Sequence, residues 1–152
     1  MSKKHVSKIL ILALVLTLSL SVCSCSVIRD VSRVPEFTEK LMSVSSVGSS
    51  EEALAKIEEL VHPSSPLNEK SIIDIAKEDD ALQGLDLEQL AKEGYSIGKI
   101  SDLELKFNDK ELGGNVYETY VDVTFGSYKF IVSVRILSDD NDIGIYDFDI
   151  SR

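Results

Sequence analysis

Two cysteines, Cys23 and Cys25, have the most reactive side chains of this 152-residue chain and stand two positions apart. Thiols at such a spacing could form a redox pair or part of a metal site. A zinc site needs three or four ligands, however, and the chain after Cys25 contains no further cysteine and a single histidine, His62. If Cys23 is removed during maturation, Cys25 has no thiol partner. We therefore expect neither a metal site nor a disulfide framework at this position.

The residues that precede the cysteines have the order of an export signal. Three lysines within the first eight residues are followed by the uncharged apolar run 9–20 and then by small residues. The run suits the central region of a secretory signal, but it is short for a transmembrane helix, which needs about 20 apolar residues. Ordinary signal cleavage near Ser24 and an uncleaved membrane anchor are the alternatives.

The segment from Val22 to Cys25 resembles the lipobox of bacterial lipoproteins. That motif has an aliphatic residue three positions before the modified cysteine and a small residue directly before it, and Val22 and Ser24 occupy these places. With Cys23 as the modified residue, the branched Val22 would stand directly before the cleavage point, so Cys25 fits better. The resemblance implies that residues 1–24 are a lipoprotein signal peptide. It also implies that Cys25 becomes a diacylglyceryl-modified N-terminus with acyl chains such as palmitate, anchored outside the cytoplasm to a bacterial cell membrane.

The charge of the remaining chain limits its partners. Beyond residue 24 the sequence holds 26 acidic residues and 13 basic ones. An excess of negative charge repels phosphate backbones and anionic lipid head groups. We therefore expect no nucleic-acid partner, and we expect membrane association to depend on the lipid anchor.

No set of side chains in the sequence predicts catalysis. His62 precedes a proline, and we expect it to interact with the carbonyl groups at the C-terminal end of a helix. The segment 138–144 suggests a calcium loop, but Gly144 stands one position too early for the EF-hand pattern, so a solvated turn is the better interpretation. A GxSxG segment and a P-loop are both missing from the sequence. We expect a protein without enzymatic activity, cofactor or bound metal.

The elements that would position a site follow from the period of the apolar residues. Helical spacing predicts helices over 35–46, 49–62, 68–79 and 86–93, with Pro35 in a first turn and Asn68 and Asp86 as caps. From residue 97 the period changes to two, which predicts strands over 97–107, 116–125, 128–137 and 144–150. This order indicates an α+β domain over 35–152, with N-terminal helices packed on one face of a curved four-stranded antiparallel meander. Residues 25–34 are expected to be the lipidated N-terminus and a short tether.

The order of elements, with LVHPSS at 60–65 and IYDFDI at 145–150, resembles the cone-shaped fold of the nuclear-transport-factor-2-like (cystatin-like) superfamily. The resemblance implies a pocket between helices and sheet. We expect five side chains of the apolar face to line it: Tyr117, Val121, Phe125, Phe130 and Tyr146. Isomerases of this superfamily use an aspartate base with tyrosine donors, but strand alternation places Asp122 on the opposite, solvent-facing side.

These observations lead to two expectations about function. The first is an exported, lipid-anchored envelope protein that acts without catalysis as a binding or interaction module, with another envelope protein as its partner. The alternative is a domain that binds a small apolar ligand in the pocket, with isomerase-like chemistry as a variant of it. Both depend on how the helices and the sheet meet.

Overall fold

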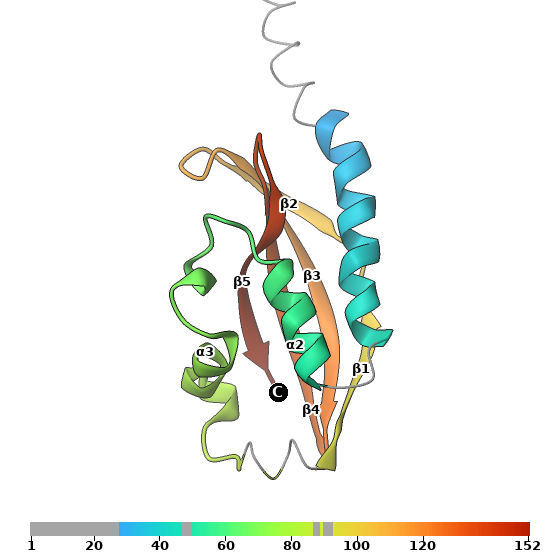
Figure 1. The fold of residues 1–152 in the computed structure, drawn as a ribbon, viewed down its shortest axis with the longest axis vertical. Coiled ribbons are helices and arrows are strands. Elements are labelled where there is room, and N and C mark those ends of the chain that lie inside the picture. Colours follow the sequence, from blue (N-terminus) through green and yellow to red (C-terminus); the bar gives the residue numbers. More distant parts are fainter. Residues whose placement is uncertain (1–27, 47–49, 87–88, 90–92) are drawn as a thin grey trace, which may run out of the picture.

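Figure 1 shows the fold of the chain in a computed structural model, which describes residues 28–46, 50–86, 89 and 93–152. Cys25 and residues 1–24 lie outside the described residues, and so does most of the helix expected over 86–93. The expected cap of that helix is described, because the Asp86 carboxylate accepts the backbone N–H of Gln89 at 3.0 Å. The chain is an α+β protein in which helices are followed by an antiparallel sheet of five strands.

The first helix extends through residues 28–43 and leads into the 3-10 turn η1, Val44–Ser46. Its expected start at Pro35 was wrong, since residues 28–34, which we assigned to the tether, are helical. The buried stripe of this helix begins with a charged residue: Asp30 is buried on the same face as Phe37 and Leu41. Apolar periodicity alone does not indicate that a carboxylate is buried, which is why the first two turns of this helix were not predicted.

Two further helices are described with both of their ends. They are α2 (Ser50–Glu59) and α3 (Ile72–Glu78), accompanied by the 3-10 turns η2 (Pro66–Asn68) and η3 (Asp80–Leu82). The third helix was expected to begin at Asn68, but α3 begins where the Ser71 hydroxyl accepts the backbone N–H of Asp74 at 3.2 Å. Asn68 instead donates from Nδ2 to the carbonyls of His62 and Ser65, which closes the turn after α2.

The sheet is formed by five strands that all pair antiparallel. Their bounds are β1 (Tyr95–Ile100), β2 (Glu104–Asp109), β3 (Gly114–Phe125), β4 (Tyr128–Ser138) and β5 (Ile143–Ser151). β3, β4 and β5 are neighbours in chain order, whereas β1 and β2 occupy successive parts of the other edge of β3.

The first expected strand is therefore two strands. Between β1 and β2, the Ser101 N–H donates to the Tyr120 carbonyl at 2.9 Å, and the Tyr120 N–H donates back to the Ser101 hydroxyl at 2.9 Å. A side chain thus replaces a backbone acceptor in the ladder and interrupts the pairing. The period of two along Leu103, Leu105 and Phe107 does not extend back to β1, where Ile97 and Ile100 are three positions apart and the register with β3 shifts between them.

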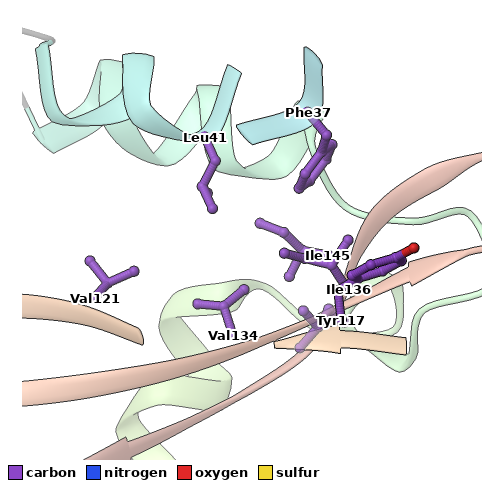
Figure 2. Close-up of a cluster of buried hydrophobic side chains, with 8 residues drawn as sticks. Phe37, Leu41, Tyr117, Val121, Val134, Ile136 and Ile145 are labelled. Atoms are coloured by element: carbon purple, nitrogen blue, oxygen red, sulfur yellow. The ribbon is translucent and has the colours of Figure 1, made fainter. Parts of the chain in front are cut away.

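The core lies between the helices and one face of the sheet. Figure 2 shows Phe37 and Leu41 of the first helix pointing toward buried side chains of the sheet, among them Ile136 and Ile145. Burying several large aliphatic and aromatic side chains in this layer is the main stabilising contribution, at about 25 cal/mol per Å² of apolar surface. Asp122 belongs to the opposite face and is exposed, as strand alternation predicted.

A glycine allows the segment after α2 to lie directly against β5. The Ile145 N–H donates to the Leu60 carbonyl, and the His62 N–H donates to the Ile145 carbonyl, both at 2.8 Å. These bonds flank a short parallel bridge between Val61 and Ile145. A Cβ atom at Gly144 would lie 2.6 Å from the His62 nitrogen, so the approach requires glycine.

Candidate functional site

An apolar hollow of about 380 Å³ lies between the helices and the inner face of the sheet. This volume falls within the range of small-molecule sites, about 300–1,000 Å³. The side chains that line it are aliphatic or aromatic and come from the first helix, η1, α2, η2, α3 and four strands: Leu41, Val44, Ala53, Leu54, Ile57, Leu67, Ile72, Ala76, Tyr95, Ile97, Ile100, Val121, Val123, Phe125, Val132, Val134, Ile145, Phe148 and Ile150. No charged side chain belongs to this described lining, so it favours an uncharged, apolar occupant.

The five side chains expected to line a pocket have different positions. Val121 and Phe125 belong to the lining of the hollow, whereas Tyr117, Phe130 and Tyr146 do not. Tyr117 is buried toward the other end of β3, where its hydroxyl donates to Asp30. Phe130 is buried and packs edge-on against Phe125, with ring centres 6.4 Å apart.

Tyr146 leaves the lining because β5 contains an irregularity in its register. Ile145 pairs with Ile136 and Asp147 pairs with Arg135, so Tyr146 has no partner on β4. An extra residue of this kind shifts the alternation of side chains by one position. Consequently Ile145, and not Tyr146, faces the hollow together with Phe148 and Ile150. Strict alternation along 144–150 could not reveal the shift.

A buried carboxylate cluster holds the first helix against the sheet. The Asp30 side chain is 3% exposed and accepts hydrogen bonds from three side chains of the sheet: Asn115 Nδ2 at 2.7 Å, the Tyr117 hydroxyl at 2.8 Å and the Ser138 hydroxyl at 2.7 Å. Arg29 Nε donates a further bond at 3.1 Å. We call these five residues the Asp30 cluster. It joins the helix to the start of β3 and the end of β4.

The pKa values in the Asp30 cluster follow from its burial and its donors. Burial by itself would raise the pKa of Asp30, but the hydrogen bonds from Asn115, Ser138, Tyr117 and Arg29 together lower it below its ordinary value. Burial and the neighbouring Asp30 carboxylate raise the pKa of Tyr117 to about 12. The cluster therefore holds an ionised carboxylate beside a protonated phenol at neutral pH.

Two arginines extend the attachment of the helix to the turn between β4 and β5. Arg29 donates to the Asp140 carboxylate at 2.6 Å and to the Ser138 carbonyl at 3.1 Å. Arg33 donates to the carbonyls of Asp139 and Asn141 at 3.0 and 3.2 Å. Both guanidinium groups thus point toward the turn, and the helix start is held by several bonds.

The acidic turn itself is organised by one of its own side chains. The Asp139 carboxylate accepts the backbone N–H groups of Asn141 and Asp142, each at 2.8 Å. Burial would raise the pKa of Asp139, but these two backbone bonds, together with the electrostatic effect of His62 and Arg29, lower it. Among the described residues, no group of three or more cysteine, histidine, aspartate or glutamate side chains could hold a metal ion. The two backbone bonds give the Asp139 carboxylate a structural role in the turn.

His62 does not interact with a helix end as we expected. Its side chain is 1% exposed and lies beyond the end of α2, where Nδ1 accepts the backbone N–H of Ser64 at 3.1 Å. Its Nε2 atom lies 3.4 Å from an Asp139 oxygen without the geometry of a hydrogen bond. The imidazole therefore packs as part of the junction between the loop and the β4–β5 turn.

Comparisons with known proteins identify no relative: no protein family, no curated protein and no solved structure matches the chain. Within residues 28–46, 50–86, 89 and 93–152, no helix has the length and apolar character needed to cross a membrane. The features of the chain that bear on function are therefore the sequence of its N-terminal segment, the hollow and the Asp30 cluster.

Proposed function

We propose that the chain is an exported, lipid-anchored protein of the bacterial cell envelope whose domain binds a small apolar molecule without catalysing a reaction. The observation that supports binding is the hollow of about 380 Å³, whose described lining is aliphatic and aromatic. The support for export and anchoring is the order of lysines, apolar run and Val22-Cys23-Ser24-Cys25 in the sequence. The resemblance to the cone-shaped superfamily belongs to the same proposal, because its members carry pockets between helices and sheet.

The position of the polar groups favours binding over catalysis. Asp30 and Tyr117 are a carboxylate and a phenol in hydrogen-bond contact, the kind of pair that could act on a substrate proton. Neither residue belongs to the lining of the hollow, and both are buried among protein donors. A molecule in the hollow would therefore meet apolar side chains and not this pair, so its binding would be driven by the removal of apolar surface from water.

An uncharged fluorescent probe tests the binding proposal. The chain from residue 26, which keeps all described residues and lacks the lipid, is titrated into N-phenyl-1-naphthylamine, whose fluorescence rises in an apolar site. We expect saturable binding. Ala76→Phe, which fills part of the hollow, should weaken it about tenfold or more, equivalent to about 1.4 kcal/mol. Ala55→Phe is the matched control, since Ala55 is exposed on α2. Equal affinities for the two variants, at comparable melting temperatures, would contradict the proposal.

A second candidate function, contact with another envelope protein, is favoured by β2. Leu105 and Phe107 are exposed on this strand, and in the described chain β2 pairs with β3 alone, which leaves its other edge open. An open edge with apolar side chains is suited to adding an extended segment of a partner as a further strand. Such a contact is compatible with a ligand in the hollow, because the two surfaces lie on different parts of the sheet.

The edge of β2 can be tested at Phe107, with an exposed apolar residue of another strand as the control. A photo-crosslinking amino acid at Phe107 should give a discrete adduct with one envelope protein in intact cells, and purified partner should then bind the wild-type chain and not Phe107→Lys. Ile131 is exposed on β4, an interior strand, and serves as the control position for both steps. Equal crosslinking from 107 and 131 would exclude β2 as a specific docking edge.

A further inference from the structure

We propose that Ile28 and Val31 contact the surface of the bilayer, an inference that rests on the lipid anchor at Cys25 proposed above. The first turns of the N-terminal helix would then touch the membrane, while the β3–β4 turn at Gly126 and Ser127 stands away from it. This assigns a membrane-facing surface to the domain and places part of the hollow at the opposite end. The surface that covers these two apolar side chains is thus the bilayer to which the same chain is attached.

The patch consists of the two most exposed large apolar side chains of the described chain. Ile28 and Val31 are each 70% exposed and, three positions apart on a helix, lie on the same side of it. They follow Cys25 by three and six residues, which an extended chain spans in at most about 10 and 20 Å. Exposed aliphatic side chains this close to an acyl anchor are within reach of the bilayer interface.

The Asp30 cluster fixes the direction in which the patch points. Asp30 lies between Ile28 and Val31 in the sequence and is turned inward, where Asn115 and Ser138 hold its carboxylate at 2.7 Å. The helix cannot rotate or detach without exposing this charge-bearing cluster. The outward direction of Ile28 and Val31 is therefore a property of the folded domain and not of a flexible linker.

The length of the chain before Asp30 excludes an inverted arrangement. Asp30 stands five positions after Cys25, and an extended chain of that length reaches at most about 18 Å. Along β3, Asn115 of the cluster is ten residues from Phe125, which corresponds to about 34 Å of strand. The chain between Cys25 and Asp30 is thus too short to place the Gly126 end of the sheet on the bilayer while the end with Asn115 points outward. Phe125 and its partner Tyr95 line the hollow at that distal end, which would face away from the bilayer.

A sideways arrangement is disfavoured by carboxylates farther along the helix. Glu36 and Glu39 are exposed, and contact of the whole helix with the bilayer would bring both into the interface, where burying a charged group is costly. The contact is also apolar in character, because Arg29 and Arg33 donate to the β4–β5 turn and lipid phosphates would have to compete with these bonds. We therefore expect the membrane contact to be no stronger in anionic bilayers, which repel the acidic chain, than in zwitterionic ones.

Depth-dependent quenching tests the arrangement on the full lipidated protein. Its single cysteine, Cys25, carries the lipid, so a reporter thiol can be introduced by Val31→Cys, Met42→Cys or Ser127→Cys, at positions that are exposed in the fold. Each variant is labelled with a nitrobenzoxadiazole dye and reconstituted into phosphatidylcholine vesicles with and without a lipid that carries a shallow doxyl quencher. We expect at least about half of the fluorescence to be lost at position 31 and little loss at positions 42 and 127.

Two results would overturn the proposal. Quenching at 42 or 127 as strong as at 31 would show a sideways or inverted domain, and absence of quenching at 31 would show a domain that stands clear of the bilayer. Failure of the anchor itself has a separate signature: a protein mass without acyl groups and loss of the protein from sedimented vesicles. The added anionic lipid phosphatidylglycerol should not strengthen quenching at 31, and a large increase there would contradict the apolar character of the contact.

Discussion

Replacing Asp30 by alanine should destabilise the domain strongly, because its carboxylate is the common acceptor of the Asp30 cluster. The substitution leaves Asn115 Nδ2 and the hydroxyls of Tyr117 and Ser138 without the acceptor they share. Removing one partner from a buried, hydrogen-bonded charge typically costs about 3–5 kcal/mol. Against a total stability of about 5–15 kcal/mol for a domain, such a loss is a large fraction of the whole.

The assay is equilibrium unfolding of the chain from residue 26 in urea, followed by far-ultraviolet circular dichroism, in which a change of midpoint at constant slope reports stability. Asp140→Ala is the matched control. Asp140 is also paired with Arg29, at 2.6 Å, but its side chain is 92% exposed, and exposed ion pairs contribute about 0–1 kcal/mol. Similar losses for the two variants, or a loss below about 1 kcal/mol for Asp30→Ala, would refute the structural role of the cluster.

Three further predictions concern the same regions. Because the pKa of Asp30 is lowered in the folded state from 3.8, its contribution to stability should be present above pH 3.8 and be lost as the pH falls below it. Urea unfolding between pH 2 and 6 should show a smaller loss for Asp30→Asn than for wild type, since the variant keeps the lowered pKa of Asp139. With its pKa raised from 10.0 to about 12, Tyr117 should favour the folded state less as the pH rises from 10 to 12; a late step in tyrosinate absorbance at 295 nm should accompany this and be missing in Tyr117→Phe. Gly144→Ala should cost about 1–3 kcal/mol in thermal unfolding through its contact with the His62 nitrogen, more than Gly98→Ala, whose Cβ would meet the Asp122 Cβ at 3.1 Å; the reverse order would contradict the proposed close approach.

The helices and strands were predictable where apolar residues carry the periodicity. The stripe of Phe37, Leu41 and Val44 indicated the first helix, and alternation along 116–125 and 128–137 indicated β3 and β4 to within about two residues. The prediction of the helix start failed at Asp30, since its place on the buried face depends on donors that lie far along the chain. Propensity and period describe neighbours in sequence and contain no information about such donors.

The candidate site was predictable only in part for a similar reason. Val121 and Phe125 were expected in a pocket and line the hollow, because both lie on the inner face of a regular strand. Tyr146 was expected there as well, but an irregularity of register in β5 turns the alternation by one position. Tyr117 was also expected in the lining, and its hydroxyl belongs to the Asp30 cluster instead.

By itself the sequence determined that helices precede an antiparallel sheet, that the chain beyond residue 24 is acidic and that the first 25 residues have an export-like order. These properties are local, since they depend on side-chain period, charge and short motifs. The tertiary structure alone decided that Asp30 is buried, that Ile28 and Val31 are exposed, and which side chains surround the hollow. Those properties depend on contacts between residues about 85 to 110 positions apart in the chain, as in the bonds from Asn115 and Ser138 to Asp30, and such contacts exist only once the helix has packed against the sheet.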